Sequence, residues 1–75
     1  MDISSIEMIP VSSSNVESIG YDDATSTLVV RFLSNSVYIY KAVPKIEYEG
    51  LKNAPSVGSY LNRNIKGLYP YERIE

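Results

Sequence analysis

The stretch TLVVRFLSNSVYIY, residues 27–40, predicts two neighbouring strands of one antiparallel hairpin. Its first half alternates so that Leu28, Val30 and Phe32 share one face of a strand. Its second half alternates β-branched and aromatic residues, which fit a pleated, half-buried surface. The polar residues 34–36 favour a tight reversal, although they lack the glycine that a two-residue hairpin turn prefers.

The segments on either side of this hairpin extend the predicted sheet. Residues 15–21 predict a half-exposed strand, because alternation separates Val16 from Ile19 and only one side has much to bury. Acidic and polar residues then predict a turn at residues 22–26. Residues 68–74 predict an extended segment that is at most an edge strand, because proline cannot donate to a central ladder. We therefore expect an antiparallel meander of three to four strands.

Two short helices are predicted between this meander and the tail. Pro44 suits the first position of a helix over residues 45–53, and Pro55 ends it. Ser56 then predicts an N-cap, and Gly67 predicts a left-handed C-terminal cap. The stripe of the second helix consists of Val57, Tyr60, Leu61, Asn64 and Ile65. The chain is thus predicted to be an α+β domain, with the helices of residues 45–66 covering one face of the sheet.

Composition excludes several classes of protein. A chain of 75 residues and 8.4 kDa allows one domain, spanning residues 1–75. It has no cysteine and no histidine, which excludes disulfides, zinc sites with thiolate or imidazole ligands, and catalysis by Ser-His-Asp or Cys-His. We expect no cofactor and no metal. No stretch reaches the roughly 18 consecutive apolar residues of a spanning helix, and Asp2 stands where a signal peptide is basic. We therefore expect a cytoplasmic protein without a membrane partner.

Charge is distributed unevenly along the chain. Residues 1–30 hold five acidic and no basic residues, whereas residues 31–75 hold seven basic against four acidic residues, a net of +3. Such asymmetry is a hint of contact with nucleic acid or a membrane surface. The competing interpretation is that a basic half faces an acidic half within one fold. The total of −2 differs from the strongly basic profile of a duplex-binding protein.

The close pairs of acidic residues do not predict an enzyme. They are Asp22 with Asp23, in a predicted turn, and Glu47 with Glu49, on a predicted helix. Catalysis of the glycosidase type needs two carboxylates held across a cleft, one of them with a raised pKa. A turn and an exposed helix face provide neither the cleft nor the burial.

Taken as a whole, the sequence from about residue 8 to residue 74 resembles the KTSC domain family. The resemblance rests on Val11-Ser12-Ser13-Ser14, Ile19-Gly20-Tyr21-Asp22, Arg31-Phe32, Tyr38-Ile39-Tyr40, Val43-Pro44, Ala54-Pro55-Ser56-Val57-Gly58-Ser59-Tyr60, Asn62, Ile65-Lys66 and Tyr69. The sequence departs from the family pattern at Asn35-Ser36, where a glycine is usual, and at Pro55. The family is named after the C-terminal extension of some lysyl-tRNA synthetases and includes free-standing small proteins. The resemblance implies RNA binding as a candidate function.

The residues that could bind nucleic acid begin with two tyrosines on one strand face. Tyr38 and Tyr40 alternate with apolar residues, Arg31 lies on the neighbouring strand, and Lys41 follows directly. Our hypothesis is that this face stacks single-stranded bases while the cations contact phosphates. In the competing interpretation the tyrosines face the helices and belong to the core, and the sequence leaves this choice open.

A second group of basic residues lies in the C-terminal half. Lys52, Arg63, Lys66 and Arg73 could form a basic patch around the second helix, or could be solvated side chains. We therefore predict a non-catalytic binding module for RNA or another single-stranded nucleic acid. The alternative is a protein–protein adaptor or homodimer that uses exposed tyrosines or an open strand edge.

Overall fold

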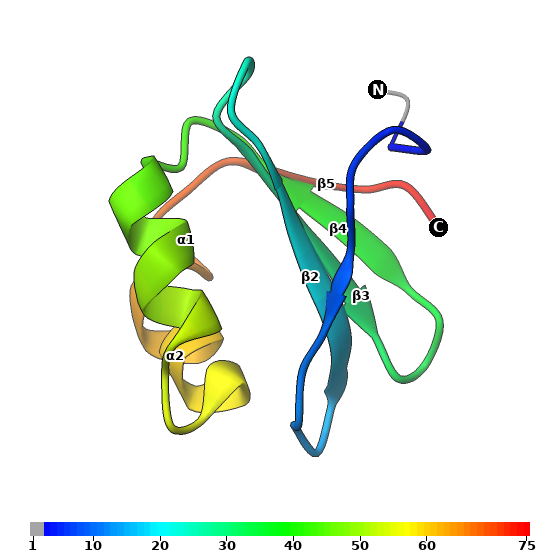
Figure 1. Ribbon diagram of the computed structural model, residues 1–75, viewed down its shortest axis with the longest axis vertical. Helices are drawn as coiled ribbons and strands as arrows, with labels where there is room; N and C mark the ends of the chain where they lie inside the picture. Colours follow the sequence, from blue (N-terminus) through cyan, green and yellow to red (C-terminus); the bar gives the residue numbers. More distant parts are fainter. Residues whose placement is uncertain (1–2) are drawn as a thin grey trace.

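The computed structural model describes residues 3–75, which form a five-stranded sheet and two helices (Figure 1). Met1 and Asp2, on which the expectation against a signal peptide rests, lie outside the described residues. The strands are β1 (Ile9–Pro10), β2 (Val16–Asp22), β3 (Thr27–Phe32), β4 (Val37–Tyr40) and β5 (Tyr71–Arg73), and the helices are α1 (Lys45–Lys52) and α2 (Val57–Asn64). Each strand pairs antiparallel with the next along the chain, in the order β1-β2-β3-β4-β5. The predicted α+β class and antiparallel meander are therefore confirmed. The sheet has one strand more than the three to four expected, because the two-residue β1 is too short to show a pattern in the sequence.

The hairpin of β3 and β4 turns without a glycine because an asparagine replaces it. Asn35 has a φ of 72°, in the left-handed region that asparagine tolerates better than most residues. Its N–H donates to the Phe32 carbonyl at 2.9 Å, and the Phe32 N–H donates to the Ser36 carbonyl at 2.9 Å. The resulting register places Val30 opposite Tyr38.

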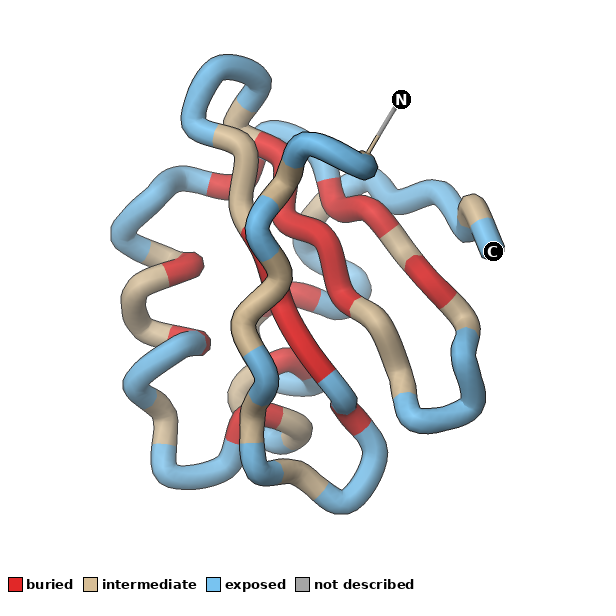
Figure 2. The backbone as a smooth tube through the Cα atoms, turned by 45° about the vertical axis from the view of Figure 1, so that its right-hand side comes forward, coloured by how far each residue is buried: buried red, intermediate tan, exposed pale blue. Residues whose placement is uncertain are grey.

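Both helices pack against one face of this sheet, as predicted (Figure 1). The Ser56 side chain accepts a hydrogen bond from the Ser59 N–H and caps α2. The core between the helices and the sheet consists of Val16, Ile19, Leu28, Val30, Tyr40, Val43, Tyr48, Leu51, Val57, Leu61 and Ile65. Figure 2 shows buried segments along the central strands and exposed turns at their ends. Within residues 3–75, neither helix is long and apolar enough to cross a membrane.

The prediction of a half-exposed strand over residues 15–21 is wrong. Val16 and Ile19 are both fully buried against the helices, although strict alternation would place them on opposite faces. The pairing with β3 shifts register between Val16 and Ser18, which is a β-bulge. An extra residue in a strand reverses the alternation beyond it, so the bulge brings both side chains to the core.

The opposite face of the sheet is also covered, by the two ends of the chain. Val29, Val37 and Ile39 form a second buried cluster. The side chains packed against it are Ile3, Ile6, Met8 and Ile74. This second cover was not predicted from the sequence, because its residues lie in short segments without periodicity.

Replacing Gly20 by alanine is expected to displace the N-terminal segment. A Cβ at this position would lie 2.7 Å from Met8 Sδ and 2.9 Å from the Glu7 carbonyl oxygen. The carbonyl belongs to the backbone, so the segment itself must move. We expect Gly20→Ala to lower the free energy of unfolding by about 1–3 kcal/mol, the usual cost of overpacking, in urea denaturation. An unchanged free energy would contradict this close packing.

Candidate functional site

The two tyrosines of β4 face the helices rather than open solvent on the far side of the sheet. Tyr40 is 2% exposed and belongs to the helix-side core, whereas Tyr38 packs against that core and is half-buried. The choice that the sequence left open is thereby resolved. The β4 face is not a free platform, and any ligand must reach these rings from beside the helix layer.

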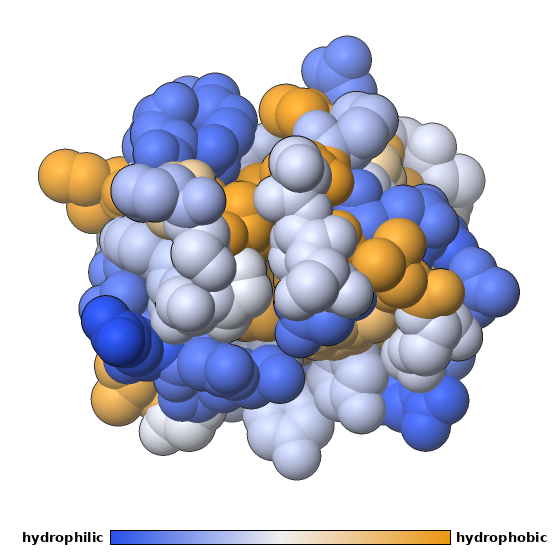
Figure 3. Space-filling model, turned by 90° about the horizontal axis from the view of Figure 1, so that it is seen from below, coloured by the Kyte–Doolittle hydropathy of each residue, from blue (hydrophilic) through white to orange (hydrophobic). Residues whose placement is uncertain are grey.

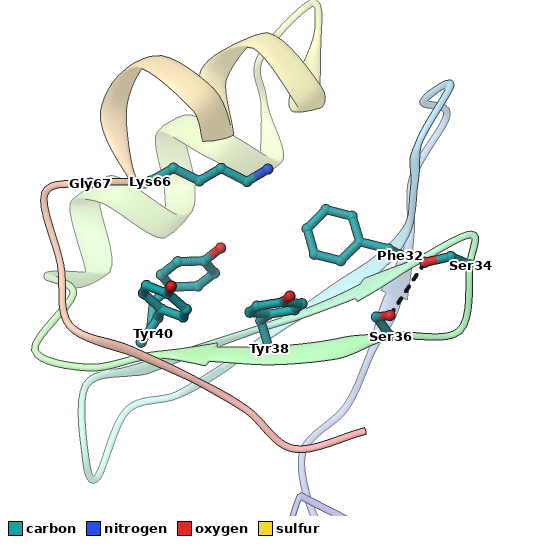
Figure 4. Close-up of a pocket in the computed structure, with 8 residues that line it drawn as sticks. Phe32, Ser34, Ser36, Tyr38, Tyr40, Lys66 and Gly67 are labelled. Atoms are coloured by element: carbon teal, nitrogen blue, oxygen red, sulfur yellow. Dashed lines mark hydrogen bonds between the residues drawn. The ribbon is translucent and has the colours of Figure 1, made fainter.

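An aromatic groove lies beside the helix layer, because the helices leave the β4–β5 side of this face partly uncovered (Figure 4). The groove has a volume of about 600 Å³. Its lining residues are Phe32, Ser34, Ser36, Tyr38, Tyr40, Lys66, Gly67 and Tyr71. Tyr71 on β5 is 63% exposed, so one ring of the groove is open to solvent.

The rings of the aromatic groove form a connected floor. The centroid of the Tyr71 ring lies 5.9 Å from that of Tyr38 and 6.0 Å from that of Tyr40. Phe32 meets Tyr38 edge-on, with centroids 5.6 Å apart. These separations are within the usual range for favourable aromatic pairs. Figure 4 shows the Lys66 side chain extending above these rings.

The Tyr40 hydroxyl stays protonated over a wide range of pH. Burial, together with the neighbouring Tyr38 and Tyr71 hydroxyls, raises the pKa of Tyr40 above its ordinary value of 10.0. A neutral phenol can both donate and accept a hydrogen bond. At neutral pH the buried Tyr40 hydroxyl is therefore an uncharged hydrogen-bonding group at the floor of the groove.

Two cations flank the aromatic groove from different sides. Lys66, just beyond α2, has its Nζ 5.3 Å from the centroid of the Phe32 ring. Arg73 is the register partner of Tyr38 on β5, so it projects on the same face of the sheet. Its Nη2 donates to the Ser36 Oγ at 3.2 Å. No lining residue of the groove is acidic, and neither cation forms an ion pair within residues 3–75.

Arg31 and Lys41 do not join this site. Arg31 alternates with Val30 and so projects on the opposite face, where its Nη1 lies 3.9 Å from a Glu75 carboxylate oxygen. Lys41 Nζ lies 3.6 Å from Glu72 Oε1, and neither residue lines the groove. The predicted arrangement of Arg31 beside Tyr38 on one face is therefore wrong, because the side chain that faces Tyr38 across the register is Val30.

The predicted basic patch around the second helix is divided in the structure. Lys52 is the last residue of α1. Its Nζ lies 3.3 Å from Glu49 Oε2 and 5.6 Å from the centroid of the Tyr48 ring. Arg63 lines a smaller depression of about 350 Å³ along α2 and the loop that precedes it. The residues of that depression are Ala54, Pro55, Ser56, Ser59, Tyr60, Arg63 and Asn64. Of the eight predicted site residues, the structure brings together Tyr38, Tyr40, Lys66 and Arg73.

Five lining residues of the aromatic groove were not predicted from the sequence, and two of them, Phe32 and Tyr71, are aromatic. Alternation placed Phe32 on one face with Val30, but its contact with Tyr38 appears only in the structure. Tyr71 lies two residues before Arg73 in a segment predicted to be extended, and that spacing puts both on one face. The sequence predicts an extended backbone at both residues, but it does not reveal which residues of the neighbouring strand they contact.

The acidic pairs have structural partners. Asp22 accepts hydrogen bonds inside its own turn, and Asp23 pairs with Lys45 at 3.5 Å. Glu47 accepts a hydrogen bond from the Tyr60 hydroxyl at 2.5 Å, which raises the pKa of that tyrosine. None of these carboxylates lines the aromatic groove. Within residues 3–75, no group of three His, Cys, Asp or Glu residues could hold a metal ion.

The fold and the groove define a small α+β domain with an aromatic depression beside its last strand. Comparison of the sequence with known families gives this class a name. The KTSC domain matches residues 12–69, and the chain belongs to the KTSC domain family. The match leaves out β1 and β5, so Tyr71 and Arg73 lie outside the matched range.

Relatives of the chain include both long and short proteins. A lysine–tRNA ligase of Nostoc punctiforme is 36% identical over 73 residues, which are 97% of this chain but 13% of the ligase. An uncharacterized protein of Stutzerimonas stutzeri is 35% identical over 71 residues and is covered along 100% of its length. The crystal structure of a KTSC domain protein from Yersinia pestis superposes with a TM-score of 0.91 at 32% identity, covering 95% of this chain and 100% of that one. This similarity confirms the fold, and it shows that the chain resembles a part of the ligases.

Proposed function

We propose that the chain is a non-catalytic binding module that holds single-stranded nucleic acid, specifically RNA, in the aromatic groove. The observation that carries the proposal is that four aromatic rings and Lys66 line one depression, with Arg73 bound to its lining residue Ser36, and that no carboxylate within residues 3–75 lines it. Aromatic rings stack on any base, and cations beside them contact the phosphates. This arrangement supports the proposal of a small binding site for a nucleotide.

The choice of RNA is supported by the relatives. The printed name of the Nostoc punctiforme protein, lysine–tRNA ligase, describes an enzyme that acts on a transfer RNA. This chain is similar to 13% of that enzyme. An accessory domain on such a ligase acts beside an RNA, so RNA is the ligand class that fits both the relatives and the groove.

A protein partner or a second copy of the chain has less support. The exposed apolar side chains Leu33, Ile46 and Leu68 come from the turn after β3, from α1 and from the segment between α2 and β5, and scattered exposed apolar residues are normal on a monomer. On the face that Figure 3 shows, apolar atoms form separate patches among hydrophilic ones. Antiparallel pairing of two β5 strands centred on Glu72 would bring like charges opposite each other, which is unfavourable.

Two single variants of neighbouring cations test the proposal. Lys66 lines the groove and Arg63 does not, although both lie near the end of α2 and neither forms an ion pair within residues 3–75. With a fluorescent, unstructured RNA octamer at low salt, we expect Lys66→Ala to weaken binding about fivefold, which corresponds to about 1 kcal/mol. Arg63→Ala should leave the affinity unchanged, and fluorescence anisotropy measures both.

The matched design makes a negative result informative. If the wild-type protein does not bind the octamer at tens of micromolar, the proposal is wrong. If both variants weaken binding equally, the attraction is a general effect of charge and does not involve the groove. The protein-partner alternative would then be the one to pursue.

A further inference from the structure

We infer that the aromatic groove binds a single nucleotide together with the phosphates on its two sides, and not an extended strand. This inference rests on the proposed function and specifies its ligand. The chemical unit is a nucleoside 3′,5′-bisphosphate, whether it occurs free, at a strand end, or as one splayed nucleotide within a loop.

The first argument is the distribution of charge. Within residues 3–75, four of the seven basic side chains are paired with carboxylates, and Arg63 lines the separate depression along α2 and the loop before it. In the four ion pairs the carboxylate neutralises the cation, so these side chains contribute little attraction for a phosphate. Among the residues that the structure describes, only Lys66 and Arg73 remain beside the aromatic groove. Channels that follow a single strand need a continuous track of cations along its backbone, and residues 3–75 do not provide such a track.

The second argument is the arrangement of the two cations around the rings. Lys66 approaches the floor from the end of α2, whereas Arg73 reaches Ser36 from the edge strand β5. Tyr38 lies between these two sides of the site, because Phe32, under Lys66, packs against it edge-on and Arg73 is its register partner. The accessible Tyr71 ring lies next to Tyr38. A base stacked on these rings would direct its two phosphates outward, one toward each cation.

The third argument is the size of the depression. Its volume of about 600 Å³ falls within the range of about 300–1,000 Å³ that is typical of sites for small molecules. Sites of this size bury most of one small ligand. A second stacked nucleotide would need another accessible ring, and among the residues that line the groove Tyr71 is the one strongly exposed ring.

Salt dependence distinguishes a one-nucleotide site from a longer one. For single strands, the slope of log K against log salt is about −0.7 for each phosphate neutralised. Two phosphates therefore predict a slope of about −1.4 for the full chain with an RNA octamer. We expect Arg73→Ala to reduce the slope to about −0.7, and Arg63→Ala to leave it unchanged.

The probes in this experiment are adenosine 3′,5′-bisphosphate, an RNA octamer and a DNA octamer of equivalent sequence. We expect the bisphosphate to bind with an affinity within about tenfold of that of the RNA octamer, because it carries the whole recognised unit. Tighter binding of the RNA octamer than of the DNA octamer assigns the site to RNA. Equal affinities assign it to the nucleotide chemistry that both strands share, and either result supports the inference.

A steep slope would overturn the inference. If the octamer binds with a slope of about −3 or steeper and the bisphosphate does not compete, the site is extended and the proposed function stands alone. If no probe binds at low salt, the proposed function itself fails. The two failures are therefore distinguishable in one set of titrations.

Discussion

A Tyr71→Ala variant is expected to keep its fold and to bind single-stranded RNA about 5- to 150-fold more weakly than the wild-type protein. Removing one stacking ring costs about 1–3 kcal/mol per base, and each 1.4 kcal/mol is about tenfold in affinity. Tyr71 is the most accessible ring of the aromatic groove, at 63% exposure, and it contacts both Tyr38 and Tyr40. Because it lies on the edge strand, the core does not depend on it.

Leu68→Ala is the matched control for this variant. Leu68 is 68% exposed and lies three residues before Tyr71, but it does not line the groove. Far-UV circular dichroism verifies that both variants are folded, and anisotropy with the RNA octamer measures affinity. Equal affinities of Tyr71→Ala and the wild-type protein would contradict a stacking role for the groove.

The second large effect is expected in the core. Leu61→Ala should lower the free energy of unfolding by about 2–5 kcal/mol, the usual cost of emptying a buried leucine site. Leu61 is 1% exposed and belongs to the cluster that joins α2 to the sheet. At about 0.05–0.15 kcal/mol per residue, a domain of this length has a total stability of about 4–11 kcal/mol. The variant therefore loses a large share of its stability.

Urea denaturation of Leu61→Ala and of Leu33→Ala measures this difference. Leu33 is exposed after β3, so its replacement should change the free energy by less than about 0.5 kcal/mol. A loss below about 1 kcal/mol for Leu61→Ala would show that the helix layer does not depend on this contact.

The elements of the fold were predictable because their signals are local. Strands β3 and β4 follow from alternation, and α2 follows from its apolar stripe and from the Ser56 cap. The turn between the strands also formed as predicted, because asparagine can replace the missing glycine. Each of these signals lies within a few residues of the element that it specifies.

The features that escaped prediction depend on contacts between distant segments. The bulge in β2 inserts a residue only in relation to β3, so alternation within one strand could not reveal that Val16 and Ile19 share a face. The cover of Val29 by Ile3 and Ile6 joins segments more than twenty residues apart. No periodicity within a short segment carries that information.

The site shows the same division between local and long-range information. Tyr38 and Tyr40 were correctly identified as a pair on one face, but the face itself depends on which neighbours fill the core. Arg31 appeared to accompany them because the register of β3 and β4 is not visible in the sequence. In the structure the cation on the tyrosine face is Arg73 and not Arg31, because the β4–β5 register places Arg73 opposite Tyr38.

The most direct test of the central claim is a backbone amide NMR titration of the labelled chain with a short single-stranded RNA at low and moderate salt. If the aromatic groove is the binding site, salt-sensitive shifts should cluster at Ser36 to Tyr40, at Lys66 and Gly67, and at Tyr71 to Arg73. Shifts confined to the opposite face around Arg31, or spectra that RNA leaves unchanged, would contradict the claim.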